Sequence, residues 1–134
     1  MAVEQTILTV DDEPANLRAV SRALSDDCRV LTASSGSEAL EVMGREPVAL
    51  VISDQRMPGM SGTEFLGKVK DLYPETMRII LSGYTEIDVV TESVNRGAVF
   101  RFLTKPWDDD LLREQVRDAF QRYRPRAAGD GASS

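Results

Sequence analysis

A chain of 134 residues, of which 42% are hydrophobic and 28% charged, has the size and composition of one globular domain with a buried core. The net charge of −6 argues against direct nucleic-acid binding, which requires a cationic surface. No apolar run approaches the roughly 18 residues that a membrane span needs, so we expect no membrane association.

Two residue types restrict the chemistry further. Histidine is absent, which excludes serine–histidine–aspartate and cysteine–histidine catalysis. Cys28 is the single cysteine, so the usual zinc sites and an internal disulfide are also excluded, and a reducing cytoplasm is the expected location. Any chemistry must therefore depend on carboxylates, hydroxyls, lysine and a hard metal ion.

Short apolar runs alternate along the chain with segments of helical periodicity. The runs, which we predict to be strands, are 7–10, 29–33, 48–52, 79–81 and 99–103. The residues that share helical faces are Leu17, Val20 and Leu24; Ala39, Leu40 and Met43; Phe65, Leu66, Val69 and Leu72; Val90 and Val94; and Leu112, Val116, Ala119 and Tyr123. The expected helix start signals are Ser35 with Glu38, Ser61 with Glu64, Thr85 and Asp108, and the stop signals are Pro74 and Gly97.

Five strand–helix units predict an α/β fold in which helices cover both faces of a five-stranded parallel sheet. We expect this domain to span residues 1–123. Residues 124–134 lose the pattern and are interpreted as a disordered tail or the start of a linker.

Four of the predicted strands end in polar residues: Asp11 and Asp12, Asp54, Ser82, and Lys105. When these strands are adjacent in a parallel sheet, the groups meet in one shallow pocket. Three carboxylates about 5 Å apart repel by roughly 3 kcal/mol per pair at an effective dielectric near 20, so they raise a pKa or recruit a cation. Oxygen ligands without a soft donor suit Mg²⁺ or Mn²⁺.

Each of these residues has an ordinary explanation when it is taken alone: a helix cap, a turn or a solvated charge. Taken together they favour phosphoryl chemistry, because a carboxylate such as Asp54 forms an acyl phosphate without a general base. The metal and Lys105 would then attract the anionic oxygens of an incoming phosphoryl group, and the Ser82 hydroxyl would donate to another.

Four motifs carry a resemblance to a known family: VDDE at 10–13, SDQRMPGMSG at 53–62, LSGY at 81–84 and LTKP at 103–106. They resemble the receiver domain of two-component response regulators over residues 6–123. The resemblance implies a flavodoxin-like (βα)5 fold with strand order 2-1-3-4-5. It also implies a signalling domain, not a turnover enzyme, that accepts a phosphoryl group on Asp54 from a histidine kinase or a phosphotransfer protein and controls an output domain or downstream protein.

The resemblance also assigns roles within the site. Asp12 and Asp54 would bind Mg²⁺ directly with the Arg56 backbone carbonyl, while Asp11 would contribute through water. Ser82 and Lys105 would contact the phosphoryl group, together with the backbone N–H groups of Arg56 and Gly83. The Ser82 hydroxyl would move toward the phosphoryl group and Phe102 on strand five would turn inward, which is the family's switch.

Three further features follow from the resemblance. Arg56 and Tyr84 flank the path of the hydrolytic water, and their bulk predicts slow dephosphorylation. Lys105-Pro106 resembles the family's cis peptide bond. Residues 95–110 resemble receivers that are fused to cyclic-dinucleotide phosphodiesterase domains or to hydrogenase-regulator-type transcriptional activators.

Residues of the fourth helix, fifth strand and fifth helix would form a partner surface of mixed charge that permits a homodimer without specifying one. Its charged residues are Asp88, Arg96, Arg101, Arg113 and Arg117. Trp107 either belongs to this surface or packs only on the last helix.

Two alternatives share parts of the pattern. A phosphatase of the haloacid-dehalogenase type also uses a phosphoaspartate, Mg²⁺ and a lysine, but it carries the nucleophile on its first strand with a second aspartate two residues later. A flavodoxin-like module has the same topology, but Asp11 and Asp12 would repel a flavin phosphate.

Overall fold

The computed structural model describes residues 5–26 and 28–123, apart from the side chain of Tyr84. One parallel sheet has the strand order β2-β1-β3-β4-β5, which confirms the predicted fold class. Its strands are β1 (Thr6–Val10), β2 (Arg29–Ala33), β3 (Leu50–Asp54), β4 (Met77–Ser82) and β5 (Arg101–Thr104). The predicted tail, 124–134, lies outside the described residues.

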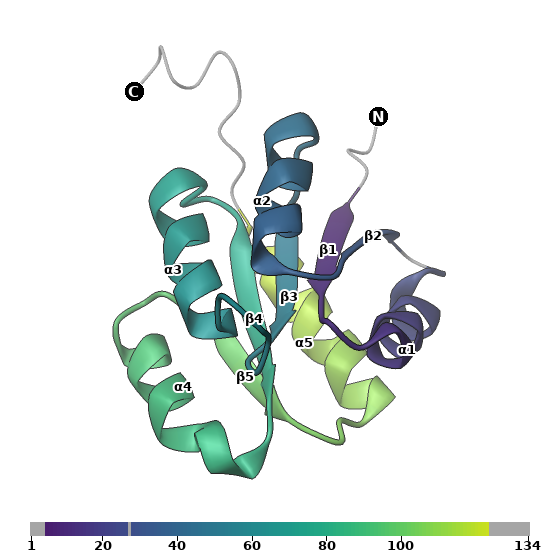
Figure 1. Cartoon of the computed structure of the whole chain (residues 1–134). Helices are drawn as coiled ribbons and strands as arrows, with labels where there is room; N and C mark the ends of the chain where they lie inside the picture. The colour runs from purple at the N-terminus through teal and green to yellow at the C-terminus, as the bar shows by residue number, and fades with distance from the viewer. Residues whose placement is uncertain (1–4, 27, 124–134) are drawn as a thin grey trace.

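Helices cover both faces of the sheet (Figure 1). They are α1 (Pro14–Leu24), α2 (Gly36–Arg45), α3 (Gly62–Leu72), α4 (Ile87–Asn95) and α5 (Asp109–Arg122), with a short 3₁₀ helix η1 (Tyr84–Glu86) before α4. Within the described residues, no helix has the length and hydropathy that crossing a membrane would require.

The third and fourth strands extend further toward their carboxyl ends than the apolar runs predicted. Asp54 pairs with Leu81 and Ser82 pairs with Thr104 as members of the sheet. Backbone pairing continues through these polar residues because their side chains do not interrupt the ladder. The strands therefore hold Asp54 and Ser82 themselves, at the strand ends where the sequence placed them.

Two of the four predicted helix starts are confirmed in full. Ser61 and Glu64 form a complete capping box, and the Asp108 carboxylate accepts a hydrogen bond from the N–H of Asp110. At α2 the Ser35 hydroxyl accepts from the N–H of Glu38, but the Glu38 carboxylate accepts from Ser34 and leaves the box incomplete. The prediction of Thr85 as a cap was wrong, because Thr85 lies inside η1 and α4 begins after Glu86.

Alternate residues of the central strands serve two separate cores. Leu8, Val51 and Ile80 pack with α2, α3 and α4 on one face. Ile7, Ile52 and Ile79 are among those that pack with α1 and α5 on the other face. Leu72 is an exception to the predicted helical faces, since it is 62% exposed and the following Tyr73 packs against the core instead.

The Arg78 side chain on β4 holds the turn between α4 and β5 by hydrogen bonds. Its guanidinium donates to the carbonyls of Ala98 at 2.8 Å and Gly97 at 3.2 Å, and also to the carbonyls of Thr76 and Pro74. Lys70 of α3 donates to the neighbouring Arg96 carbonyl at 3.1 Å. The carboxyl end of α4 is therefore held by charged donors from two elements.

Gly62 brings α3 directly against the end of β3. Its N–H donates to the Gln55 carbonyl at 2.9 Å. A Cβ atom at this position would lie 2.9 Å from the Gln55 Cα and would also collide with the Asp54 carbonyl oxygen. Because Gly62 has no side chain, α3 can approach the end of β3 closely and form this hydrogen bond beside Asp54.

We predict that Gly62→Ala lowers the free energy of unfolding by about 1–3 kcal/mol, because backbone atoms at this contact have to move apart. Gly67→Ala is the matched control on the same helix: nothing lies within 4 Å of the added Cβ, so it should stabilise by up to about 1 kcal/mol. Urea unfolding of both variants measures the difference, and equal effects would contradict the close contact at Gly62.

Candidate functional site

Three carboxylates meet at the carboxyl end of the sheet, as the sequence predicted. Asp11 and Asp12 follow β1 directly and Asp54 is the last residue of β3. One carboxylate oxygen from each lies within 4.8 Å of the other two. Asp11 and Asp54 are buried, at 3% and 5% exposed, whereas Asp12 is exposed. The cluster therefore opens toward solvent on the Asp12 side.

Lys105 supplies positive charge to this cluster from the end of β5. Its Nζ forms an ion pair with Asp54 Oδ1 and lies 3.8 Å from Asp11 Oδ2. The Lys105 N–H donates to the Ser82 carbonyl at 2.9 Å, which ties the residue to β4. The Lys105-Pro106 peptide bond is cis, as predicted.

Asp11 is the least satisfied member of the cluster. Its Oδ1 accepts a hydrogen bond from the Glu13 N–H at 2.9 Å, but its buried Oδ2 has no hydrogen-bond partner among the described residues. Burial raises the pKa of Asp11, the Glu13 N–H opposes that shift, and the charge of Asp54 adds to it. A buried carboxylate oxygen that lacks a hydrogen bond and lies beside two other carboxylates is suited to a hard divalent cation, so the donor set fits Mg²⁺.

Ser82 and Phe102 occupy neighbouring positions on β4 and β5. Ser82 pairs with Thr104, which lies two residues beyond Phe102, so all three side chains lie on one side of the sheet. Ser82 is 1% exposed and its hydroxyl donates to the Gly83 carbonyl at 3.0 Å. Phe102 is partly buried against the core that includes Val90 of α4. The arrangement connects the site to α4 through packed side chains.

An ion pair joins the loop after β3 to the short helix η1. No sequence pattern indicated it. Arg56 Nη2 lies 2.9 Å from Glu86 Oε2, across thirty positions of sequence. Arg56 follows Asp54 by two residues, and Glu86 ends η1 just before α4. The partner of Arg56 depends on the register of β3 against β4, which no local pattern reveals.

Side chains also fix the loop after β3. The Gln55 side chain accepts from the Thr63 N–H at 2.9 Å and donates to the Thr63 hydroxyl at 3.3 Å. The Ser53 hydroxyl donates to the Asp54 carbonyl at 2.9 Å. These contacts hold the backbone on either side of Asp54 and were not anticipated from the sequence.

Trp107 packs against the core formed with α1 and α5, and its indole N–H donates to Asp109 at 3.1 Å. Trp107 therefore packs on a core that includes the last helix, but it is only half-buried, so a place on the partner surface stays a prediction. Tyr84 lies in η1, but its side chain is outside the described residues, so its place beside the water path stays a prediction.

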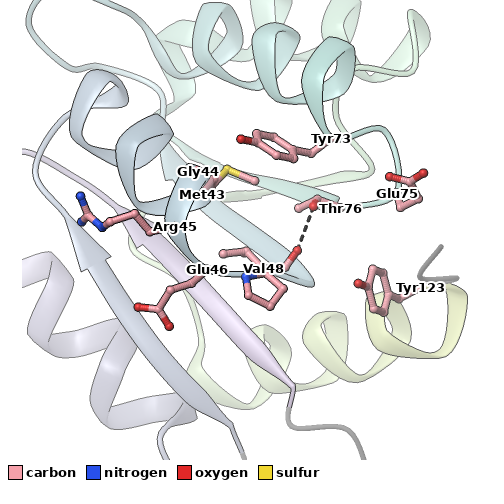
Figure 2. Close-up of a pocket in the computed structure, with 10 residues that line it drawn as sticks. Met43, Gly44, Arg45, Glu46, Val48, Tyr73, Glu75, Thr76 and Tyr123 are labelled. Carbon is pink, nitrogen blue, oxygen red and sulfur yellow. Dashed lines mark hydrogen bonds between the residues drawn. The ribbon is translucent and has the colours of Figure 1, made fainter. Parts of the chain in front are cut away.

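A pocket of about 540 Å³ lies at the opposite end of the sheet (Figure 2). Its lining includes residues 43–48 before β3, residues 73, 75 and 76 before β4, and Tyr123 at the end of α5. The Thr76 hydroxyl donates to the Val48 carbonyl across it at 2.8 Å. None of the cluster carboxylates lines this pocket, so it takes no part in their chemistry.

Comparison with known proteins agrees with this fold and cluster. The family model described as the response regulator receiver domain matches residues 7–117. The chain belongs to this family, which is a component of two-component signalling.

Relatives include the types that the sequence suggested. The hydrogenase transcriptional regulatory protein HoxA of Cupriavidus necator is 42% identical over 118 residues, which cover 88% of this chain and 24% of that protein. A probable cyclic di-GMP phosphodiesterase of Vibrio cholerae is 35% identical over 90% of this chain and 28% of its own length. The chain thus spans about a quarter of the length of these curated relatives.

Solved structures give the same result. The signal receiver domain of an HD domain-containing protein from Pseudomonas fluorescens superposes with a TM-score of 0.86 at 31% identity, covering 92% of this chain and 91% of that one.

We predict that Mg²⁺ raises the melting temperature of the wild-type chain, because a ligand that binds only the native state stabilises it, by about 2.7 kcal/mol at one hundred times its Kd. Asp12→Asn should reduce this shift, whereas Asp71→Asn, an exposed carboxylate on α3, should leave it unchanged. Differential scanning calorimetry with and without Mg²⁺ makes the measurement.

Asp11→Asn should change the melting temperature of the metal-free protein as well as its response to Mg²⁺. Since the pKa of Asp11 is raised by folding, its contribution to stability is complete below its unfolded pKa and is lost as pH rises through the folded value. At neutral pH, metal-free Asp11→Asn should therefore melt above metal-free wild type, yet gain less from Mg²⁺. A lower melting temperature of metal-free Asp11→Asn at neutral pH would contradict the view that the charged Asp11 carboxylate destabilises the metal-free protein.

Proposed function

We propose that Asp54 accepts a phosphoryl group from a phosphohistidine on a partner histidine kinase or phosphotransfer protein. The observation that supports this most directly is the pairing of a buried Asp54 with Lys105 beside Asp11 and Asp12. The donor histidine belongs to the partner, since this chain has no histidine. In this proposal the chain is a signalling domain of the cytoplasm and not a turnover enzyme.

The transfer step is an in-line displacement at phosphorus. An Asp54 carboxylate oxygen attacks the phosphorus, the P–N bond to the donor histidine breaks, and the histidine nitrogen keeps the electron pair and takes up a proton. The product is an acyl phosphate on Asp54. Lys105 then exchanges part of its contact with the Asp54 carboxylate for a phosphoryl oxygen, so its positive charge follows the developing negative charge.

The metal-binding residues of this proposal are Asp11, Asp12, Asp54 and the Arg56 carbonyl, which would hold Mg²⁺, with Mn²⁺ as a substitute. When bound, the cation supplies positive charge that offsets carboxylate repulsion and orients the phosphoryl oxygens. The buried Asp11 Oδ2, which has no hydrogen-bond partner among the described residues, supports this assignment.

The proposed switch begins with the Ser82 hydroxyl. Phosphorylation offers it an anionic oxygen in place of the neutral Gly83 carbonyl, and a charged acceptor makes the stronger hydrogen bond. Movement of Ser82 then vacates space on the side of the sheet where Phe102 lies, and the ring turns into it. Because Phe102 packs beside α4, the change reaches the face formed by α4, β5 and α5.

That face would control an output domain, a downstream protein or a homodimer. HoxA carries transcriptional regulation in its name and the Vibrio cholerae relative is named a phosphodiesterase, and both are longer than this chain. We propose that residues 1–123 form the receiver domain and that residues 124–134 are a tail or begin a linker to such an output. The net charge of −6 assigns any DNA contact to another domain.

The phosphatase alternative is weakened by the placement of the nucleophile. Asp54 lies on β3 and not on the first strand, and Arg56 stands where that family carries its second aspartate.

Incubation with acetyl phosphate and Mg²⁺, followed by intact mass spectrometry, tests the proposed acceptor. Wild type should gain the mass of one phosphoryl group, and Asp54→Asn should gain none, because an amide oxygen is too weak a nucleophile. Asp71→Asn, exposed and far along α3, is the control that should still react. Failure of wild type to gain mass would count against the assignment, as would continued labelling of Asp54→Asn.

We also expect slow loss of the phosphoryl group, because Arg56 and Tyr84 crowd the approach of water. Replacing Tyr84 with alanine should shorten the half-life by up to about tenfold, equivalent to about 1.4 kcal/mol of barrier. The decay of purified phosphoprotein, followed by intact mass, measures this. A wild-type half-life of only seconds would show that the bulk does not hinder attack.

A further inference from the structure

The Arg56–Glu86 ion pair links the phosphoacceptor loop to the start of α4. Its two atoms lie 2.9 Å apart, with the Arg56 side chain 77% exposed and the Glu86 side chain 26% exposed. Glu86 is the N-cap residue of α4, and its side chain makes no capping hydrogen bond within the described part of the chain. The Glu86 carboxylate is therefore committed to Arg56 and not to its own helix.

The two ends of α4 are held very differently. At the carboxyl end, the carbonyls of Arg96, Gly97 and Ala98 accept hydrogen bonds from Lys70 or Arg78. Arg78 is itself fixed by the Thr76 carbonyl at 2.9 Å. At the amino end, the tie to the site is a partly exposed ion pair, which solvent screens and weakens. The amino end also has a backbone hydrogen bond from the Glu86 N–H to the Gly83 carbonyl at 3.2 Å. Its side-chain contact with the site is therefore weaker than the side-chain contacts at the carboxyl end.

Arg56 is also within reach of a phosphoryl group on Asp54. Arg56 follows Asp54 by two residues, so their Cα atoms lie at most about 7 Å apart, a span that an arginine side chain covers. A phosphoryl group carries nearly two negative charges and three acceptor oxygens, against the single charge of a carboxylate. Arginine can form bidentate hydrogen bonds with either group, so the additional charge favours the phosphoryl group.

We propose that Arg56 exchanges Glu86 for the phosphoryl oxygens when Asp54 is phosphorylated, and that loss of the ion pair frees the amino end of α4. Arg56 is then a phosphoryl-binding residue and Glu86 a positioning residue that acts through it. This inference rests on the proposed function and adds a second, electrostatic route from the site to α4 beside the Ser82–Phe102 route. The Arg78 and Lys70 contacts make the carboxyl end of α4 the fixed point of the movement.

The two single variants should change the phosphoryl half-life in opposite directions. Glu86→Gln removes the competitor for Arg56, so the guanidinium stays on the phosphoryl group and the half-life should lengthen by about threefold, the size of an exposed ion pair. Arg56→Gln removes the phosphoryl contact, so the half-life should shorten. A merely structural tie would shift both variants in the same direction. Glu92→Gln is the matched control, because it removes an exposed ion pair with Arg96 on the same helix and should change nothing.

Hydrogen exchange of the α4 amides, read by mass spectrometry, tests the second half of the inference. In the absence of a phosphoryl donor, Glu86→Gln should raise hydrogen exchange in the first turn of α4. The charge swap Arg56→Glu with Glu86→Arg should return exchange in that turn to the wild-type level. The swap should nevertheless have a short phosphoryl half-life, because the carboxylate introduced at position 56 would repel the phosphoryl group. Phosphorylation of wild type should raise exchange in the same turn and leave residues 96–98 protected.

The outcomes separate this inference from the function on which it rests. Absence of any phosphoryl adduct on wild type overturns both. An adduct with equal shifts in the Arg56→Gln and Glu86→Gln half-lives, or with unchanged exchange at the start of α4, overturns the exchange of partners alone.

Discussion

Repulsion among Asp11, Asp12 and Asp54 is the constraint on which the rest of the site depends. Parallel pairing of β1 with β3 brings the three carboxylates together at the carboxyl end of the sheet. Among the described residues, Lys105 forms ion pairs with two of them, Asp11 and Asp54. Burial raises the pKa of Asp11 and the charge of Asp54 adds to that rise, while the buried Oδ2 of Asp11 has no hydrogen-bond partner among the described residues. The folded chain thus tolerates an electrostatic cost that a bound cation would offset in the proposed function.

A cost of this kind persists only when the surrounding backbone is held firmly. Gly62 allows α3 to pack on the end of β3, the Ser61–Glu64 box fixes the start of that helix, and Gln55 bonds to Thr63. The amino end of α4 lacks comparable support. The backbone after Asp54 is therefore held by several hydrogen bonds, whereas the side-chain contact at the amino end of α4 is one partly exposed ion pair.

Much of the fold and of the carboxylate cluster could be predicted from the sequence, and the same physical reasons explain which contacts could not. Apolar runs and helical periodicity report burial, so they identified five strand–helix units and, through the strand ends, the residues of the cluster. The apolar runs themselves stop before Asp54 and Ser82, because these two residues are polar yet paired in the sheet. The Arg56–Glu86 pair and the Arg78 hydrogen bonds depend on three-dimensional neighbours that lie far apart in sequence, and Thr85 failed as a cap because a 3₁₀ turn intervenes.

The order of the strands has a consequence for synthesis of the chain. All three carboxylates are complete by residue 54, and β1, β2 and β3 are neighbours that can pair as soon as they emerge from the ribosome. Lys105 follows β5, the last strand to be made and an edge of the sheet. Lys105 can therefore form its ion pair with Asp54 only after the last-made strand has joined the sheet.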